Sequence, residues 1–349
     1  MLEIDGSFGE GGGQILRTSL ALSILTDTPI HIYNIRKNRA REGLAPQHLK
    51  TISAIEELTG SVVEGNFVGS TEVKFTPKNE FKRRATINIG TAGSITLLLQ
   101  SLMIFLPFLE NKTTISVHGG TNVQWSPQID YLREVTIPTL ERMGYKIVIN
   151  NVLRGYYPEG GGNVEIEVNP IKKLKAIQID KFEKSSKIEG ISYSTNLPEN
   201  VTERQKKSAR GVVFREGVTP NIKIQTEKDS SPRIGSGIFL YSKDKTAVIG
   251  DGALGAKGKR AEEVGEEGAK NFLEKYKEGF DCHLSDQIAP YMALAEGKSY
   301  IYTKSTSHLE TNISILEKFC DNKFSWKDNL LEVDGIGFKT ADKLALSMG

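Results

Sequence analysis

One histidine near the C-terminus has the surroundings of a nucleophile. His308 follows a polar run that starts at Ser305, and it directly precedes a helical pattern of apolar residues over 313–319. An imidazole has an ordinary pKa of about 6.5, so most of the ring is neutral at pH 7 and can become covalently nucleotidylated. Upstream, residues 283–287 place further polar groups at the head of a second apolar segment. A histidine at a helix start is often merely solvent-exposed, so this interpretation needs support from other motifs.

Two N-terminal stretches contain residue types that bind phosphate. Gly11, Gly12 and Gly13 precede a helical pattern, where glycine lets the backbone approach an anion closely at the positive end of the helix. Residues 36–41 then place four cations within six positions. A tight turn without a ligand and a solvated charged surface are the simpler interpretations of these stretches. Taken alone, neither stretch establishes an anion site.

The composition is that of an ordinary globular protein. The chain has 349 residues, 38% of them hydrophobic and 25% charged, and a net charge of +2, so any binding of nucleic acid needs a local basic patch. The longest apolar segment, 95–109, is too short and too interrupted to cross a bilayer, and we expect a buried helix there. The acidic start does not fit a signal peptide, and Cys282 and Cys320 lack the CxxC spacing of a metal site. We expect a cytoplasmic protein with reduced thiols and no membrane association.

Landmarks recur along the chain at fixed spacing. Glycine-rich turns start at Gly9 and Gly90, 81 residues apart, and the same distance separates Pro46 from Pro127. Helical patterns follow each of these landmarks, which argues for a duplicated unit. A third copy is indicated by two pairs at an offset of 260 residues, His48 with His308 and Glu72 with Glu332.

The recurrence predicts an α/β fold of three units, each with two helices backing a small sheet. Residues 184–277 fit no copy; they have their own pattern of strands and helices, and lysine-rich sequence borders them. These are the features of a domain inserted into an exposed connection. We therefore expect a discontinuous large domain, 1–183 and 278–349, and an inserted small domain, 184–277. The sequence leaves open whether the chain forms a homo-oligomer.

The C-terminal residues 335–345 are similar to one half of a helix-hairpin-helix motif, which binds the DNA backbone. Its glycines would expose backbone amides to a phosphate at a helix start. The first helix of such a motif is missing, because the preceding residues match a strand. A short capping helix is the simpler interpretation.

Considered together and in this order, the motifs resemble the RNA 3′-terminal phosphate cyclases. The resemblance extends over nearly the whole chain and is weakest in residues 184–277 and beyond 335. Each motif alone is weak, and their shared order makes the set specific. The stretches that carry the resemblance are Gly9–Arg17, Ile35–Arg39, Gln47–Leu49, Gly119–Thr121, Tyr157–Gly162, His283–Gln287 and Thr306–Asn312.

This resemblance implies a fold and a reaction. The family has three repeated βαβαββ-like units, similar to the C-terminal domain of initiation factor three, plus a smaller inserted α/β domain. The implied enzyme uses ATP to convert an RNA 3′-phosphate end to a 2′,3′-cyclic phosphate. A histidine attacks the α-phosphate of ATP, AMP passes to the terminal RNA phosphate, and the neighbouring 2′-hydroxyl displaces AMP.

The resemblance also implies residues that hold the nucleotide. His308 matches the adenylated histidine, a nucleophile that divides one hard step into two easier ones. Asp286 and Gln287 would hydrogen-bond the sugar or the imidazole, His283 would lie near the adenine, and Pro127 would pack on the base. The full set of matching nucleotide-binding positions is Gln47, Gln100, Pro127, His283, Leu284, Ser285, Asp286 and Gln287.

Other matching positions face the phosphates. Arg17, Arg39 and His48, together with Gln47, match positions next to the triphosphate and the RNA phosphate. Arginine suits this role because its planar fork stays charged and can donate two hydrogen bonds to one phosphate. Glu10 matches the carboxylate for a divalent ion, Mg²⁺ or Mn²⁺, bound mainly by oxygen ligands. The implied partner is RNA with a 3′-phosphate end.

Three other functions remain open from the sequence. A cyclase-like ribosome-assembly protein keeps the fold but lacks the histidine, so His308 with Asp286 and Gln287 favours an enzyme. An enolpyruvyl transferase is another glycine- and arginine-rich protein of repeated α/β units, but it forms no covalent nucleotide. A DNA-binding role would use residues 335–345.

Overall fold

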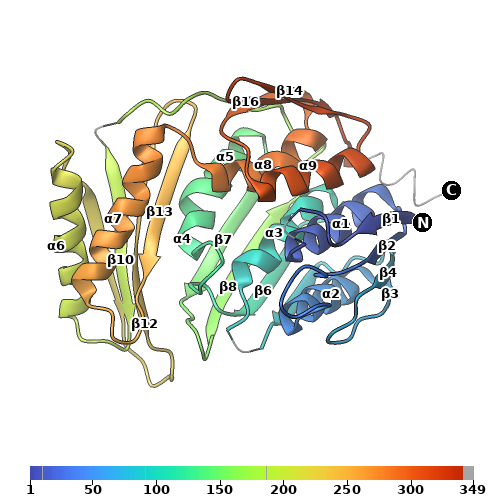
Figure 1. Cartoon of the computed structure of the whole chain (residues 1–349). Coiled ribbons are helices and arrows are strands. Elements are labelled where there is room, and N and C mark those ends of the chain that lie inside the picture. Colours follow the sequence, from blue (N-terminus) through green and yellow to red (C-terminus); the bar gives the residue numbers. More distant parts are fainter. Residues whose placement is uncertain (10, 91, 186, 341–349) are drawn as a thin grey trace.

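The computed structural model describes residues 1–9, 11–90, 92–185 and 187–340 (Figure 1). Its helices and strands form four mixed sheets, each of four strands, with helices packed against them. The predicted α/β class is confirmed. Figure 1 shows the sheet of β10 to β13, with α6 and α7, at one end of the molecule.

The first sheet contains the N-terminal strands in the order β1-β2-β4-β3. β1 and β2 are parallel, and the other neighbours are antiparallel. Apolar side chains alternate along β2 and β4, with Ile30, Ile32, Val73 and Phe75 buried, so one face of the sheet packs on the core. The elements are β1 (Leu2–Asp5), α1 (Gly13–Thr26), β2 (Ile30–Tyr33), α2 (Pro46–Thr59), β3 (Val62–Glu64) and β4 (Val73–Thr76).

The second sheet has the order β5-β6-β8-β7, and again only its first pair is parallel. Its second helical stretch is interrupted by a π-helical turn, η2, a feature that is frequent at functional sites. The elements are β5 (Arg84–Asn88), α3 (Ile95–Phe105), the 3-10 turn η1 (Leu106–Phe108), β6 (Thr113–Gly119), α4 (Ile129–Tyr131), η2 (Leu132–Thr136), α5 (Ile137–Arg142), β7 (Lys146–Leu153) and β8 (Gly162–Asn169).

The third sheet is assembled from two separated parts of the chain. Its order is β15-β16-β14-β9, and the pair of β9 with β14 is parallel. The chain leaves this sheet after β9 and returns to it only at β14. The elements are β9 (Gln178–Ile179), α8 (Cys282–Leu294), β14 (Glu296–Tyr302), α9 (Ser307–Phe319), β15 (Phe324–Lys327) and β16 (Leu330–Ile336).

The fourth sheet lies between β9 and α8 in the chain and has the order β11-β10-β12-β13. Both long helices of this region, α6 and α7, pack against it and against each other. The elements are β10 (Ile188–Thr195), α6 (Asn200–Phe214), β11 (Asn221–Glu227), β12 (Gly235–Lys243), β13 (Val248–Leu254) and α7 (Ala261–Glu278).

Helices rather than strands join the first three sheets. α1 packs against α3 and α9, and α8 packs against α3 and α9. The predicted buried helix is α3, where nearly every side chain is buried, and its run continues into η1 with Pro107. None of the helices in the described ranges is both long and apolar enough to cross a membrane.

The structure differs from the sequence predictions in local bounds. The sequence pattern places the polar residues 283–287 ahead of an apolar segment, but α8 already starts at Cys282, because the Asp281 carboxylate caps it, accepting from the backbone N–H groups of His283 (3.1 Å) and Leu284 (3.4 Å). The sequence pattern of residues 184–277 also gave no indication of the strand β13 (Val248–Leu254).

At the C-terminus, Gly335 belongs to β16 and so does not start a helix. The Phe338 ring packs edge-on against Phe108, with centroids 5.0 Å apart. The remainder of the hairpin-like segment, 341–345, lies outside the described residues.

Candidate active site

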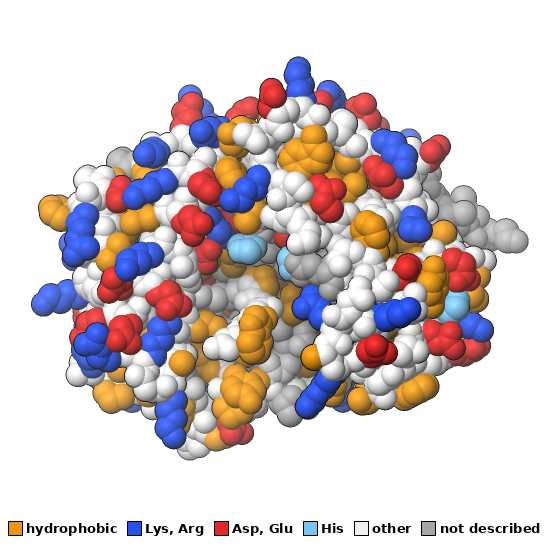
Figure 2. Space-filling view, viewed as in Figure 1, with side chains coloured by type: hydrophobic (Ala, Val, Ile, Leu, Met, Phe, Trp, Pro, Cys, Tyr) orange, Lys and Arg blue, Asp and Glu red, His pale blue; other side chains and the backbone are white. Residues whose placement is uncertain are grey.

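A pocket of about 1020 Å³ lies where the central helices meet the fourth sheet. Residues of α1, α2, α3, α8 and α9 line it, and residues of β12 and β13 line it as well. Figure 2 shows a hollow on this face, with histidine side chains at its edge. A pocket of this size holds a ligand as large as a nucleotide.

Four helices direct their N-terminal ends at the pocket. Gly13 starts α1, and His48, His283 and His308 lie in the first turns of α2, α8 and α9; all four line the pocket. The first N–H groups of a helix have no partner within the helix and carry partial positive charge. Their convergence makes the pocket suited to an anion such as a polyphosphate.

Gly13 brings the backbone of α1 close to two functional side chains. A Cβ atom on this residue would lie 2.6 Å from Nε2 of His48 and 2.9 Å from a terminal nitrogen of Arg17. Because residue 13 is a glycine, the first turn of α1, the Arg17 guanidinium and the His48 imidazole can all occupy one corner of the pocket. Burial lowers the pKa of Arg17 to about 10, which still leaves the side chain charged at pH 7.

The His48 ring is held in one tautomer. Its Nδ1 accepts a hydrogen bond from the backbone N–H of Ala45 (3.1 Å), so the neutral ring carries its proton on Nε2. Burial, reinforced by the charges of Arg17 and Arg36, lowers the pKa of His48 to about 4. At neutral pH this side chain is an uncharged donor beside Arg17.

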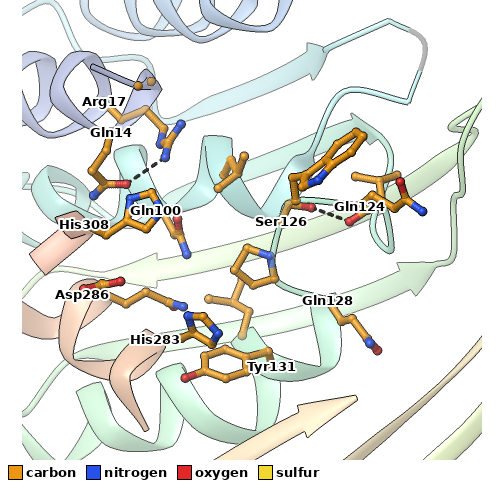
Figure 3. Close-up of a pocket in the computed structure, with 18 of the residues that line it drawn as sticks. Gln14, Arg17, Gln100, Gln124, Ser126, Gln128, Tyr131, His283, Asp286 and His308 are labelled. Atoms are coloured by element: carbon orange, nitrogen blue, oxygen red, sulfur yellow. Dashed lines mark hydrogen bonds between the residues drawn. The ribbon is translucent and has the colours of Figure 1, made fainter. Parts of the chain in front are cut away.

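The side chain of His308 is exposed and lines the pocket from the first turn of α9. Figure 3 shows it with Gln100 and Asp286, all directed into the same hollow. Thr306 caps α9: its hydroxyl accepts from the backbone N–H of Leu309 (3.1 Å) and donates to a carboxylate oxygen of Asp286 (3.0 Å). The cap thus fixes the helix start that carries the histidine against α8.

Amide side chains connect the side of the pocket that contains Arg17 to the side formed by α8 and α9. Arg17 donates to the Gln14 side chain (2.8 Å), which donates to Asn312 (2.9 Å), and Asn312 donates to the backbone carbonyl of Asp286 (2.9 Å). Thr18 also donates to Asn312 (2.8 Å). This chain of hydrogen bonds couples α1, α9 and α8, so the positions of Arg17 and Asp286 depend on each other.

The opposite part of the pocket is largely apolar. Pro127, Tyr131 and Tyr291 line it, and both tyrosines are almost fully buried. The carbonyl of Pro127 accepts from the Thr96 hydroxyl (2.8 Å), which holds the proline in place. Flat apolar surfaces beside the Gln100 amide suit a planar heterocyclic base.

A buried ion cluster links the fourth sheet to the start of α8. The Lys275 ammonium of α7 lies 2.9 Å from the carboxylates of both Asp251 and Asp281. Burial alone would lower the pKa of Lys275, but the two carboxylates outweigh it and raise the pKa. Because Asp281 caps α8, this lysine helps to fix the helix that carries His283.

Comparison with known proteins identifies the family. A family model described as RNA 3′-terminal phosphate cyclase matches residues 8–326. This range contains the whole lining of the pocket. The chain belongs to the RNA 3′-terminal phosphate cyclase family.

Cyclases of several archaea are similar over nearly their full length. The RNA 3′-terminal phosphate cyclase of Pyrococcus abyssi (strain GE5 / Orsay) is 44% identical over 326 residues, 93% of this chain and 94% of that protein. The cyclase of Pyrobaculum aerophilum is 44% identical over 345 residues, 97% and 99% of the two chains. Among solved structures, an EPSP synthase from Acinetobacter baumannii has a TM-score of 0.31 and 12% identity over 96% of this chain and 82% of that one, which is too low to bear on fold or function.

Most residues that the cyclase resemblance singled out lie together. Leu284 and Ser285 do not line the pocket; both are buried, and the Ser285 hydroxyl donates to the carbonyl of Cys282 (2.7 Å) within α8. Glu10 lies outside the described residues. The predicted site residues that do line the pocket are Arg17, Arg39, Gln47, His48, Gln100, Pro127, His283, Asp286, Gln287 and His308.

Sequence reasoning gave no role to several residues at the pocket. Gln14 lines the pocket and Asn312 is buried behind it; both belong to the stretches that resemble the cyclases, and this was the available signal for them. Tyr131, Asp251 and Lys259 also line the pocket, but they carry no motif. Only the fold shows that β13 and the loop after it reach the pocket.

Proposed function

We propose that this protein converts RNA 3′-phosphate ends to 2′,3′-cyclic phosphates with ATP as the energy source. Membership of the cyclase family supports the reaction. The observation that carries the site assignment is the placement of His308 in one pocket with Arg17, Arg39 and the ends of four helices. A non-catalytic member of this fold would have no use for a histidine there.

The proposed reaction has three displacements at phosphorus. A nitrogen of the His308 ring attacks the α-phosphorus of ATP and pyrophosphate leaves, giving a histidine–AMP bond. The RNA 3′-phosphate then attacks the same phosphorus and releases the histidine, giving RNA(3′)pp(5′)A. Finally the 2′-hydroxyl attacks the terminal RNA phosphorus, loses its proton and expels AMP, which closes the cyclic phosphate.

The pocket residues divide between the two ends of the nucleotide. Arg17, Arg39 and the neutral His48 donor, with the amides at the start of α1, would stabilise charge on the non-bridging phosphate oxygens. In the apolar part, Pro127 would pack on the adenine. Gln100 and His283 would also contact the base. Gln47 would contact the phosphates.

Around the sugar, Asp286 and Gln287 would hydrogen-bond the ribose or the imidazole. Gln287 already accepts from the Thr136 hydroxyl (2.7 Å), so its amide nitrogen is oriented by the fold. Leu284 and Ser285 would act indirectly, by packing the start of α8.

We further propose a divalent cation, Mg²⁺ or Mn²⁺, with Glu10 as its protein carboxylate. Gly12 and Gly13, close to Glu10 in the chain, line the pocket, which fits an oxygen ligand next to the phosphates. When bound, such an ion neutralises negative charge on the triphosphate.

At the level of architecture, we propose three copies of one βαβαββ-like unit and an inserted domain. The matching strand orders β1-β2-β4-β3, β5-β6-β8-β7 and β9-β14-β16-β15 support the repeats. The exit of the chain after β9 and its return at α8 support a small domain over 184–277 within a large domain, 1–183 and 278–349. Two free thiols, Cys282 and Cys320, fit a reducing compartment such as the cytoplasm.

The decisive experiment is transfer of label from α-labelled ATP to the protein in the presence of Mg²⁺ or Mn²⁺. The wild type should acquire an acid-labile, alkali-stable label, and His308→Ala should acquire none. The matched control is His118→Ala, since His118 is exposed on β6 away from the pocket and should keep full labelling. Labelling that survives in His308→Ala would refute the assignment, as would failure of the wild type to cyclise a 3′-phosphorylated oligonucleotide.

A further inference from the structure

One aromatic side chain at the pocket is almost completely exposed. Trp125 is 95% exposed and lines the pocket, whereas the other tryptophan, Trp326 on β15, is 38% exposed. An exposed indole gains nothing from packing in the folded protein. Its position beside a nucleotide pocket therefore calls for a ligand that covers it.

The loop that carries Trp125 is held firmly on both sides. Before it, the backbone N–H groups of Thr121 and Asn122 donate to the carbonyl of Gly155 (2.9 and 3.1 Å), and the Asn122 side chain is buried. After it, the Ser126 hydroxyl donates to the carbonyl of Val123 (3.0 Å). The tryptophan thus projects from a loop with a fixed shape.

The backbone of Trp125 adopts a conformation that bulky residues avoid. Its φ angle is +60°, in the left-handed region that favours glycine. Such strain persists where the surrounding structure imposes it, and it is concentrated at ligand-binding sites. The loop holds the indole outward at a conformational cost instead of turning it into the core.

The loop that carries Trp125 lies on the side of the pocket opposite Arg17. Figure 3 shows Gln124 and Ser126, the neighbours of Trp125, across the pocket from Gln14 and Arg17. The buried tyrosines Tyr131 and Tyr291 already provide an enclosed apolar site for one base. A second planar group reaching the same reaction centre would come from the other substrate.

We propose that Trp125 is a stacking platform for the 3′-terminal nucleobase of the RNA substrate. This inference rests on the proposed function, which assigns residues to the phosphates and to the adenine but none to a base of the RNA. Single-stranded RNA ends have unstacked bases, which stack on aromatic side chains, and such stacking tolerates any base because each has a π face. The contact would place the terminal ribose phosphate in the pocket without selecting a sequence.

Tryptophan fluorescence gives a direct binding test. In a Trp326→Phe background, Trp125 is the only tryptophan of the chain. Titration with a 3′-phosphorylated oligonucleotide that has a 2′-O-methyl terminus, and so cannot cyclise, should quench the emission. The same oligonucleotide with an abasic terminal residue should quench it much less. Equal quenching by the two, or none by either, would overturn the proposal.

Kinetics provide an independent test. Trp125→Ala should raise the KM for 3′-phosphorylated RNA by about 5- to 150-fold, as expected for loss of one base stack. Trp125→Phe should restore most of the affinity, and Trp326→Ala should leave the KM unchanged. Labelling by ATP should remain at the wild-type rate in Trp125→Ala.

Other outcomes assign the tryptophan elsewhere. Slower labelling by ATP in Trp125→Ala, with an unchanged KM for RNA, would mean that the indole contacts the adenine. A dimer in the wild type that dissociates in Trp125→Ala, again with an unchanged KM, would mean that a second copy covers it. Failure of the proposed function is recognised separately, because then wild-type protein is not labelled by ATP, while the fluorescence titration still reports RNA binding.

Discussion

His48 and His308 occupy matching places in the chain, yet their rings are suited to different work. Nδ1 of His48 accepts from the backbone of Ala45, so the nitrogen that remains carries a proton and has no lone pair with which to attack phosphorus. The low pKa of His48, about 4, keeps it neutral near pH 7. With these properties, His48 is suited to donate a hydrogen bond from a fixed position. The sequence alone could not make this distinction.

The His48 environment predicts a pH dependence of stability. Its pKa is about 4 when folded and about 6.5 when unfolded, so the unfolded state binds the proton more readily. The neutral ring therefore favours the folded state above pH 6.5, and that contribution is lost as pH falls from about 6.5 towards 4. Urea denaturation at pH 7 and pH 5 should show a smaller pH-dependent loss of unfolding free energy in His48→Gln than in the wild type. An unchanged difference would contradict the assigned pKa.

At the scale of elements, the pocket depends on how α1 begins. Gly12 is the N-cap and has no side-chain cap, and Gly13 leaves room for Arg17 and His48. Neither stability nor helix propensity requires glycine at the first helical position, since alanine is the better helix former. Its presence is explained by the groups that it accommodates.

Replacement of Gly13 by alanine should therefore separate activity from stability. The added Cβ would displace the Arg17 guanidinium and the His48 ring, and a misplacement of about 1 Å can slow a reaction by about 100-fold. We expect Gly13→Ala to keep or raise the melting temperature while the rate of labelling by ATP falls by about 10- to 100-fold. The control is Gly211→Ala in α6, where a Cβ meets no atom within 4 Å; it should also preserve stability but leave the rate unchanged. A Gly13→Ala protein with wild-type rate would show that this corner does not contribute to catalysis.

At the scale of the whole molecule, the pocket joins parts that are distant in the chain. Lys275 on α7 contacts Asp281 at the start of α8, and Gly250 of β13 donates its backbone N–H to the same carboxylate (3.2 Å). The region between β9 and α8 thus braces the helix that carries Asp286 and Gln287. Docking of this region and the geometry of the nucleotide pocket are coupled.

Lys275→Met should consequently destabilise the protein. It would leave two carboxylates, Asp251 and Asp281, without their shared cation, and breaking a buried ion pair typically costs about 3–5 kcal/mol. Lys270→Met is the matched control on the same helix, because the Lys270–Glu266 pair is exposed and its loss should cost less than about 1 kcal/mol. Urea denaturation followed by circular dichroism measures both. Equal effects of the two substitutions would show that the buried cluster does not anchor α8.

The sequence by itself determined the α/β class, most of the helices and strands, and the family. These follow from local patterns and ordered motifs: the apolar run of α3, the alternation in β2, and the stretch around His308 can each be recognised without knowing what lies across from them. Eight of the ten predicted site residues that line the pocket belong to such motifs; Gln100 and Pro127 lie outside the motifs.

Only the tertiary structure decided how the site is assembled. The hydrogen bonds from Gln14 to Asn312 and from Asn312 to Asp286 join residues far apart in the chain. The tautomer of His48 depends on its bond to the Ala45 backbone, and the exposure of Trp125 depends on how its loop is anchored. The burial of a side chain, its protonation state and its hydrogen-bond partners all depend on its neighbours in three dimensions. Residue type and spacing along the chain do not specify those neighbours.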